Sequence, residues 1–482
     1  FGSLKSLADF ESSDFYSLER FNEIQVADLV NPLILIKNCS RHYGSRYFTT
    51  SDLSEFMDRP FHLIQEMLLN LSFLGFVRYD TEEKMIEVNQ RCFDFVEKHS
   101  KRQDYDMIHF RSDQAPPNPN GLLNLRTGQL DLFGVKIINF SEARNVSAYP
   151  SGDKISIDKN RKISFDGQVT SGLVKFFGTD FSLEYDQFEM ELDHIDKIML
   201  QVRVPVENNS NELRTVDISS IIENTSGSLF MDHPENKSGI LADELQEYPM
   251  FVADTTAYVY YDQKLIQNGA YTRDSFYFSA DNLVLKGLDS DHLKDSLSFN
   301  GQFITAGIFP EINVNLGYQE DNSLGFDTLY TPALGYPIYG ARGTFYEQIN
   351  MNSEGLLGNG ILEYMGATMQ SENFLFLPDE VQSKVTTIDI SQDIVEAGSP
   401  QASGNEVNIS WKPNEDKMVA NQEEGLMNLY EGVAFDGDVY IEPDGLKGNG
   451  ILRLPGYRVE SKDFHFFQNS FQAHGADFFV LS

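Results

Sequence analysis

The chain has 482 residues, of which 41% are hydrophobic and 12% are aromatic, and its 73 acidic and 37 basic side chains give a formal net charge of -36. A chain of this length and apolar content is not disordered, and we expect about two to four domains or a repeat architecture. The strong negative charge argues against nucleic acid and anionic membrane surfaces as partners.

The first predicted module covers residues 1–112, with a helical period from about Asp28 to Ser100. The first helix has an apolar stripe and a glycine that suits a C-cap. A second helix opens with cap residues at Thr49–Asp52, and a third is expected with Asp58 as its N-cap and Pro60 in its first turn. The stripe and its cap are Leu33, Ile36, Cys39, Tyr43 and Gly44.

Two short alternating runs follow the third helix and predict a hairpin. They cover residues 76–79 and 84–88, on either side of a polar turn. Three helices and a hairpin are typical of a winged helix. The third helix region contains only Arg59 and His62 as basic side chains, together with Glu66, so we expect a packing or protein-docking module rather than a DNA-binding one.

The only cysteines, Cys39 and Cys92, both lie in this module. Two cysteines make neither a disulfide framework nor a metal site, so we predict buried free thiols. A disulfide between them is the alternative.

Residues 113–121 are rich in proline and asparagine and predict a linker. Beyond it the period is two almost everywhere, which predicts a first β-repeat region over residues 122–335 and a second over residues 336–482. Similar phrases at 163–169, 297–303 and 435–441 indicate a copied structural unit. The predicted fold is therefore mainly β, a winged-helix-like α+β module followed by an elongated β-solenoid or stacked β-jelly-roll body.

The clearest repeat matches residues 354–377 with residues 444–467 at an offset of 90. Its glycines predict a tight corner between two strands, and its paired phenylalanines predict one continuous apolar ladder through stacked copies. A phosphate-binding loop is the weaker alternative, because no helix follows either copy. The predicted structural-repeat residues are Gly355, Gly358, Gly360, Phe374 and Phe376 in the first copy, and Gly445, Gly448, Gly450, Phe464 and Phe466 in the second.

No sequence pattern predicts catalysis, a cofactor or a resident metal. His-Glu-x-x-His and Gly-x-Ser-x-Gly motifs are absent from the sequence. His194 and His292 stand among acidic residues, and His292 lies near Asp289, Asp291 and Asp295. Such a group suits a cation such as calcium or a general base, but a solvated acidic turn is the explanation that we favour. A polysaccharide-active enzyme on a β-solenoid is the enzymatic alternative.

The sequence begins at Phe1 without a signal-peptide pattern, ends on the strand-like phrase at 478–482, and has no stretch of ~20 apolar residues. We expect a fragment of a longer chain, with membrane association only through regions outside it.

The phrases YSLERF, NPLILI, YGSRYFT, LGFVRYD and DYDMIHFRS, together with the glycine repeat, resemble very long envelope-associated repeat proteins of Bacteroidetes bacteria. The β body is also loosely similar to the jelly-roll repeats of lipopolysaccharide-transport bridge proteins. These resemblances imply a periplasmic or outer-membrane-associated location. We expect a non-enzymatic structural, scaffold or assembly role with other envelope proteins or further copies of the chain as partners, and a lipid or glycan carrier as the alternative.

Overall fold

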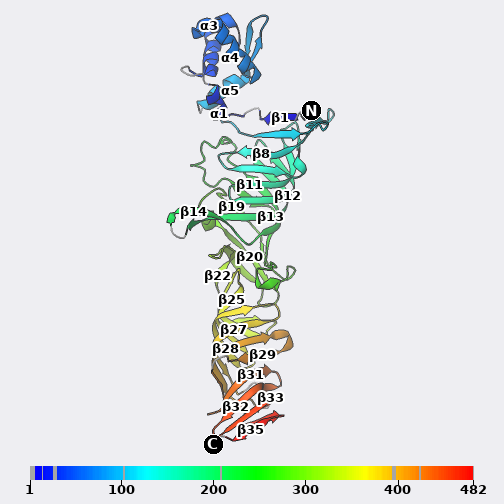
Figure 1. Ribbon diagram of the computed structural model, residues 1–482, viewed down its shortest axis with the longest axis vertical. Helices are drawn as coiled ribbons and strands as arrows, with labels where there is room; N and C mark the ends of the chain where they lie inside the picture. Colours follow the sequence, from blue (N-terminus) through cyan, green and yellow to red (C-terminus); the bar gives the residue numbers. More distant parts are fainter. Residues whose placement is uncertain are drawn as a thin grey trace. The chain divides into compact units, whose positions relative to one another are not determined.

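The computed structural model describes residues 6–12, 15–24, 30–100, 104–206, 209–392, 398–422 and 425–480 (Figure 1). The protein is mainly β, with 53% of its residues in strands and 14% in helices, which confirms the predicted β-rich class. Within the described ranges, no helix combines the length and apolar character needed to cross a membrane. The predicted helical start at Asp28 and the final residues Leu481 and Ser482 lie outside these ranges.

The chain divides into two compact units. Unit 1 comprises Phe1–His194, Ser228–Phe251 and Lys286–Ser290, and unit 2 comprises Ile195–Gly227, Val252–Leu285 and Asp291–Ser482. The predicted boundaries at residues 112, 121 and 335 stay predictions.

Unit 1 begins with strand β1 and a helical part that contains a small antiparallel sheet in the order β2-β4-β3. The predicted three helices and hairpin are present at the expected places, with one further helix before them and one after them. The elements are β1 (Ser6–Glu11), α1 (Leu18–Glu23), α2 (Pro32–Tyr43), β2 (Tyr47–Thr49), α3 (Thr50–Met57), α4 (Phe61–Phe73), β3 (Val77–Asp80), β4 (Met85–Val88) and α5 (Gln90–His99).

Local capping explains where these helices begin and end. Gly44 ends α2 in the left-handed conformation, and Thr49 caps α3 through a reciprocal pair of bonds with Asp52, as predicted. The expectation for Asp58 is wrong: it ends α3 in the left-handed conformation, and α4 begins after Pro60, which is its N-cap residue. Proline has no N–H to satisfy, so it suits this position without an aspartate cap.

The core of the helical part contains the predicted stripe except for one residue. Leu33, Ile36 and Cys39 are fully buried, whereas Tyr43 is 41% exposed at the last turn of α2. Cys39 and Cys92 are both buried free thiols, which confirms the prediction and leaves the disulfide alternative without support.

The remainder of unit 1 is a set of antiparallel strands after the helical part. β1 pairs with β5 in register from Ser6 opposite Gln114 to Glu11 opposite His109, so the two ends of the helical part leave from one strand pair. The strands are β5 (His109–Gln114), β6 (Gly121–Leu123), β7 (Leu130–Phe133), β8 (Val135–Ser141), β9 (Val146–Pro150), β10 (Lys154–Ile157), β11 (Ile163–Ser171) and β12 (Val174–Glu184). The predicted linker thus includes the end of β5 and the first residue of β6.

Four strands include residues of both units: β13 (Glu189–Val206), β15 (Ile222–Phe230), β16 (Met250–Ala253) and β19 (Val284–Lys286). The first part of unit 2 contains β14 (Asn209–Asp217), β17 (Ala257–Tyr260), β18 (Phe276–Ala280), the short helix α6 (Leu293–Ser296), β20 (Ser298–Thr305), β21 (Ile312–Tyr318), β22 (Leu324–Tyr330) and β23 (Tyr336–Ile338).

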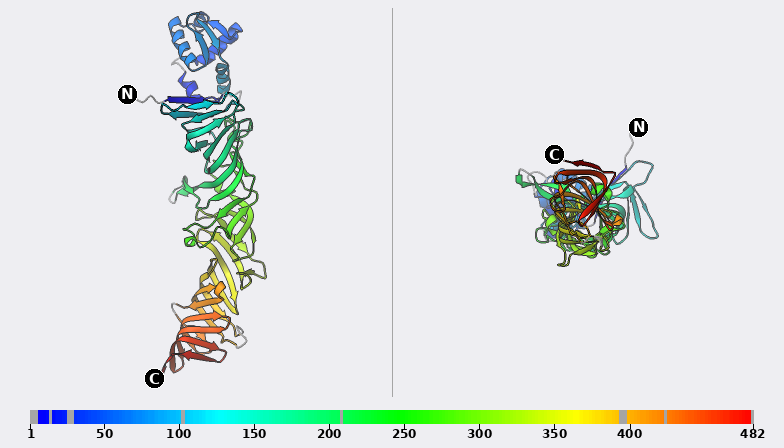
Figure 2. Two further views of the ribbon diagram at one scale, coloured as in Figure 1. Left: turned by 90° about the vertical axis from the view of Figure 1, so that its right-hand side faces the viewer. Right: turned by 90° about the horizontal axis from the view of Figure 1, so that it is seen from below.

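The last part of unit 2 is an antiparallel sheet in which most successive strands are hydrogen-bonded neighbours, while β30 pairs with β28 and β31, and β35 pairs with β33 (Figure 2). Short connections between strands bring sequence-adjacent residues into direct pairing. The strands are β24 (Gly343–Asn352), β25 (Gly355–Tyr364), β26 (Ala367–Phe376), β27 (Val381–Ile390), β28 (Ala402–Lys412), β29 (Lys417–Asn421), β30 (Met427–Leu429), β31 (Ala434–Glu442), β32 (Gly445–Leu454), β33 (Tyr457–Phe467), β34 (Ser470–His474) and β35 (Asp477–Val480).

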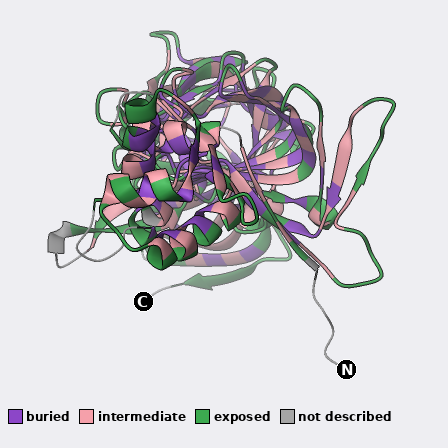
Figure 3. Ribbon diagram, turned by 90° about the horizontal axis from the view of Figure 1, so that it is seen from above, coloured by how far each residue is buried: buried purple, intermediate pink, exposed green. Residues whose placement is uncertain are grey.

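Burial alternates along these strands because successive side chains point to opposite faces of a sheet. In β26, Ala367, Met369 and Ser371 are buried, while Thr368 and Gln370 between them are exposed. Figure 3 shows this change between buried and more exposed segments along the ribbons. The burial along β26 therefore follows the period-two pattern of the sequence.

Candidate functional site

The two repeated phrases occupy equivalent pairs of strands in unit 2, β25–β26 and β32–β33. The predicted corner at the glycine-rich segment is wrong, because all of its glycines lie within one strand in each copy. The chain reverses instead at the following turn, next to Gly366 and Gly456, both of which have positive φ. The phrase therefore encodes a complete hairpin rather than a corner.

The glycine pattern produces a β-bulge at the same place in both copies. The register shifts between Gly358 and Gly360 in the first copy and between Gly448 and Gly450 in the second. At Gly360 a Cβ would lie 2.1 Å from the Tyr346 carbonyl oxygen, and at Gly450 a Cβ would lie 2.2 Å from the Asp436 carbonyl oxygen. No other residue fits there, since the neighbouring backbone occupies the space.

Gly358 and Gly448 serve a different purpose, which is to leave room for aromatic rings. A Cβ at Gly358 would lie 2.6 Å from the Phe345 ring and 2.7 Å from the Phe376 ring. In the second copy, a Cβ at Gly448 would lie 2.8 Å from both Phe435 and Phe466. Two rings thus occupy the space that a side chain would need at each glycine. Packing this close is destabilised by even one added carbon atom.

Each copy contains a compact three-ring cluster with edge-to-face geometry. The ring centroids of Phe345 and Phe376 are 5.1 Å apart, and those of Phe435 and Phe466 are 5.4 Å apart. The third ring of the first cluster is Phe374, whose centroid is 5.7 Å from that of Phe345. The third ring of the second cluster is Phe464, whose centroid is 5.5 Å from that of Phe435. Among the described rings, none of the first cluster contacts one of the second, so the predicted continuous ladder is wrong and two separate clusters take its place.

Phe345 and Phe435 were not among the predicted repeat residues, although they stand at the same offset of 90. They lie on β24 and β31, the strands that pair with the glycine-rich strands. The structural repeat therefore has three strands, not two. The sequence contains a signal for the third strand, because the phrase at 435–441 begins with Phe435 and directly precedes the second copy of the repeat.

A buried serine fixes the second hairpin strand in each copy. Ser371 Oγ accepts a bond from the Asn373 amide at 3.0 Å and donates to the Lys384 carbonyl at 3.2 Å. Ser461 makes the same pair of bonds, to the Asp463 amide at 3.0 Å and to the His474 carbonyl at 2.7 Å. Lys384 and His474 are thereby held at equivalent places, in strands β27 and β34.

Tyr271 holds the start of the first copy in place. Its hydroxyl accepts a bond from the Leu356 amide at 2.9 Å and donates to the Phe376 carbonyl at 2.8 Å. Burial raises the pKa of Tyr271 above its ordinary value, so the hydroxyl keeps the proton that it donates.

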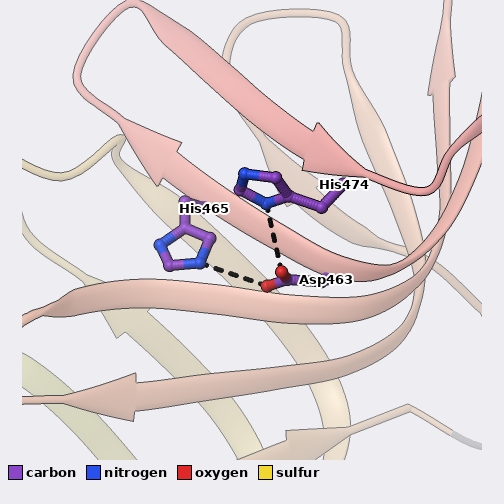
Figure 4. Close-up of side chains that lie close together, drawn as sticks. All are labelled: Asp463, His465 and His474. Atoms are coloured by element: carbon purple, nitrogen blue, oxygen red, sulfur yellow. Dashed lines mark hydrogen bonds and ion pairs between the residues drawn. The ribbon is translucent and has the colours of Figure 1, made fainter.

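The second copy also brings together two histidines and an aspartate on its surface (Figure 4). Asp463 and His465 lie two residues apart on one face of β33, and His474 of β34 is directly opposite Asp463. His465 Nε2 lies 3.1 Å from one carboxylate oxygen and His474 Nδ1 lies 3.0 Å from the other. Their ligand-type atoms are all within 4.8 Å of one another.

This cluster escaped the sequence analysis because histidine pairs were sought at helical spacing. His465 and His474 are nine residues apart, and only the turn between β33 and β34 makes them neighbours. An Asp-x-His phrase followed by a histidine beyond a short turn is the signal that could have identified it.

The acidic groups that the sequence singled out do not converge. His194 lies 3.1 Å from Asp180, and His292 lies 3.4 Å from Asp295, both on exposed surfaces. The other two aspartates face arginines in their own units: Asp289 lies 4.0 Å from Arg144, and Asp291 pairs with Arg203. The contacts of His194, His292 and Asp291 are exposed, whereas Asp289 lies beside the buried Arg144.

Unit 1 contains an apolar hollow of about 320 Å³ between its first strands and the strands β10 to β12. Asp158 and Arg161 contribute polar side chains to its lining. Its apolar lining is formed by Phe10, Ile108, Phe110, Ile157, Ile163 and Leu183. A hollow of this size and lining suits a small apolar ligand.

Comparison with protein-family models, with curated proteins and with solved structures finds no match to this chain.

Proposed function

We propose that this protein is a non-enzymatic structural or assembly protein of the bacterial cell envelope, with a winged-helix-like docking module and a body of stacked β repeats of solenoid or jelly-roll type. The proposal depends on one observation, which is that the residues duplicated in the repeat are packing residues. The matched residues are the bulge glycines, the three-ring clusters and the buried serine, which act in packing rather than in chemistry.

Selection for a reaction would repeat or retain a set of convergent acid, base or nucleophilic groups. The repeat instead retains interior contacts and varies positions outside the buried core, for example Asn373 against Asp463 and Leu375 against His465. Such a pattern is typical of a unit copied to extend a body, since each copy needs the same core and imposes nothing on its surface.

Strand β35 favours association with a second copy of the chain. In the described part of the chain, β35 pairs with β33 along Tyr457–Glu460, and its other edge can accept a strand. Phe478 and Val480 are 61% and 72% exposed on it. An apolar edge with unpaired backbone groups is a template for pairing with another strand.

Helix α4 supports a docking role for the helical part. It has no lysine or arginine, which disfavours phosphate contacts, and it presents Leu63, Leu69 and Phe73 to solvent. Phe73 is 91% exposed. An exposed apolar helix face without basic residues fits a protein partner better than a nucleic acid. The envelope location rests on the resemblance to Bacteroidetes repeat proteins.

Sedimentation velocity over a wide concentration range tests the assembly role. The expected result is reversible association that Val480→Lys abolishes, because a charge on the edge strand blocks pairing. Tyr330→Lys, at an exposed position of β22, is the matched control and should leave association unchanged. A chain that stays monomeric throughout would count against the proposal. Incubation with bacterial and plant glycans, read out as new reducing ends, tests the enzymatic alternative.

The apolar hollow in unit 1 favours a lipid carrier as the second candidate function. A fluorescent fatty-acid probe should then bind the wild-type chain and lose affinity for Ile163→Arg, which places a charge in the lining. Absence of saturable probe binding would remove this candidate.

A further inference from the structure

We propose that Asp463, His465 and His474 form a binding site for one divalent transition-metal ion, with Zn²⁺ as the ion that the ligand set fits best. The inference does not depend on the assembly role, because it concerns the surface chemistry of one hairpin.

The geometry already directs the donor atoms toward a common point. His465 Nε2 and His474 Nδ1, the nitrogens that would bind the ion, both face the Asp463 carboxylate (Figure 4). The two rings are 5.8 Å apart and nearly perpendicular, which lets each nitrogen reach a shared ion without ring overlap. Ligand atoms that lie within 4.8 Å of one another need only a small adjustment to surround one ion at the metal–ligand distances of about 2.0–2.2 Å that zinc requires.

The chemistry of the donors selects the class of ion. Two imidazole nitrogens and one carboxylate oxygen match the three-ligand zinc sites that leave a fourth position for water. Calcium and magnesium need mostly oxygen ligands, and a single carboxylate cannot supply them. Cu²⁺ and Ni²⁺ share the preference for imidazole, so they are competitors in the test rather than a separate proposal.

Neighbouring contacts hold two of the three ligands in place. Ser461 bonds both the Asp463 amide and the His474 carbonyl, which ties the two strands at the level of the cluster. Lys447 lies opposite His465, but its charge is compensated by Glu442 at 2.7 Å and Asp444 at 2.8 Å. The cluster can therefore accept a cation without an unbalanced positive neighbour.

The first copy of the repeat provides an internal comparison. At the offset of 90, Asn373, Leu375 and Lys384 replace the three ligands, while Ser371 makes the same bonds as Ser461. The backbone that supports the cluster is thus present twice, and the ligands are present once. The metal site is a feature of the second copy and not a requirement of the fold.

The experiment is isothermal titration of ZnCl₂ into the full chain without a polyhistidine tag, after removal of metal with a chelator. One equivalent should bind, and Co²⁺ should give the visible absorption of a tetrahedral site. The variant Asp463→Asn, His465→Leu, His474→Lys copies the first repeat, so it should fold, and it should lose that equivalent or bind it at least about tenfold more weakly. His194→Ala, at an exposed His–Asp pair, is the control and should change nothing.

The reverse exchange makes the test sharper. Asn373→Asp, Leu375→His, Lys384→His in the wild-type background should raise the stoichiometry from one zinc to two. Zinc should also raise the melting temperature of the wild-type chain and not that of the variant without ligands. Unchanged zinc binding in that variant, or no binding by the wild-type chain, would overturn the proposal.

Discussion

Gly358 lies so close to the ring of Phe345 that a methyl group at Gly358 would be 2.6 Å from the ring carbon Cζ. Phe345 is fully buried and contacts three further rings, so it has no space into which it can move. We expect Gly358→Ala to destabilise the protein by about 1–3 kcal/mol, the usual cost of overpacking a core. Thermal unfolding followed by circular dichroism measures the effect.

A double-mutant cycle with Phe345→Leu tests whether contact with the ring, rather than the loss of glycine's backbone freedom, causes the destabilisation. The leucine shortens the side chain at the point of contact. The alanine should cost less in that background than in the wild-type chain, because the clash is relieved. Strictly additive effects would contradict this account of the glycine.

Phe464 and Phe73 test whether the ring clusters stabilise the body. Phe464 is fully buried, and its replacement by alanine should cost about 3–5 kcal/mol through lost burial and the cavity that remains. Phe73 is 91% exposed, and Phe73→Ala should change stability by less than about 0.5 kcal/mol. The difference in melting temperature between the two variants checks the prediction, and equal melting temperatures would contradict it.

The repeat illustrates which parts of this structure the sequence could predict. Period-two patterning and the matched glycines predicted the β-rich class and the equivalence of residues 354–377 and 444–467, because alternation and backbone close approach leave direct marks on residue type. The corner expected at the glycine-rich segment was mispredicted, since such a segment suits a bulge within a strand as well as a corner. Only the pairing register distinguishes the two.

The histidine–aspartate cluster was missed for a related reason. Asp463 and His474 are neighbours only because β33 and β34 pair in one particular register, and a shift of one residue would place His474 on the opposite face. The aspartates near His292 were grouped by sequence proximity, yet two of them pair with arginines more than 80 positions away along the chain. Proximity along a strand does not determine which side chains meet.

Arg144 and Asp232 form a buried ion pair that should be essential to unit 1. Arg144 is 3% exposed and Asp232 is fully buried, and their side chains make two bonds of 2.7 Å and 3.2 Å. Arg144→Met should cost about 3–5 kcal/mol, because it leaves a buried carboxylate without its partner. Arg453→Ala breaks an exposed pair with Asp436 at 2.8 Å and should cost less than about 1 kcal/mol.

Chemical denaturation of the two variants measures these costs. A small effect of Arg144→Met, similar to that of Arg453→Ala, would show that other groups compensate Asp232 and would refute the prediction.

Glu442 should make the stability of unit 2 depend on pH. Burial opposes its ionisation, but ion pairs with Lys447 at 2.7 Å and Lys417 at 3.2 Å outweigh burial and lower the pKa of Glu442 below its ordinary value. A lowered folded pKa adds stability that is fully present above the unfolded value of about 4.3 and is lost as the pH falls through the folded value.

Glu442→Gln should therefore lower the melting temperature at pH 7, by an amount corresponding to about 1 kcal/mol or less for a partly exposed pair. The difference from the wild-type chain should shrink as the pH falls below about 4, since the wild-type carboxylate is then protonated. Melting curves from pH 7 to pH 3 check this, and a difference that stays constant over the range would argue against the ion pairs as its cause.

Cys39 and Cys92 should react with thiol reagents only when the helical part unfolds. Burial raises the pKa of each thiol to about 12, with the Asp52 carboxylate adding to the effect at Cys39, so little of the reactive thiolate forms at pH 8. A colorimetric thiol titration of the native chain should proceed slowly, whereas two thiols should react rapidly in guanidinium without any reductant. Cys92→Ser should reduce that number to one. Rapid native reaction would contradict the burial of these thiols, and an absence of reactive thiols in guanidinium would instead indicate a disulfide.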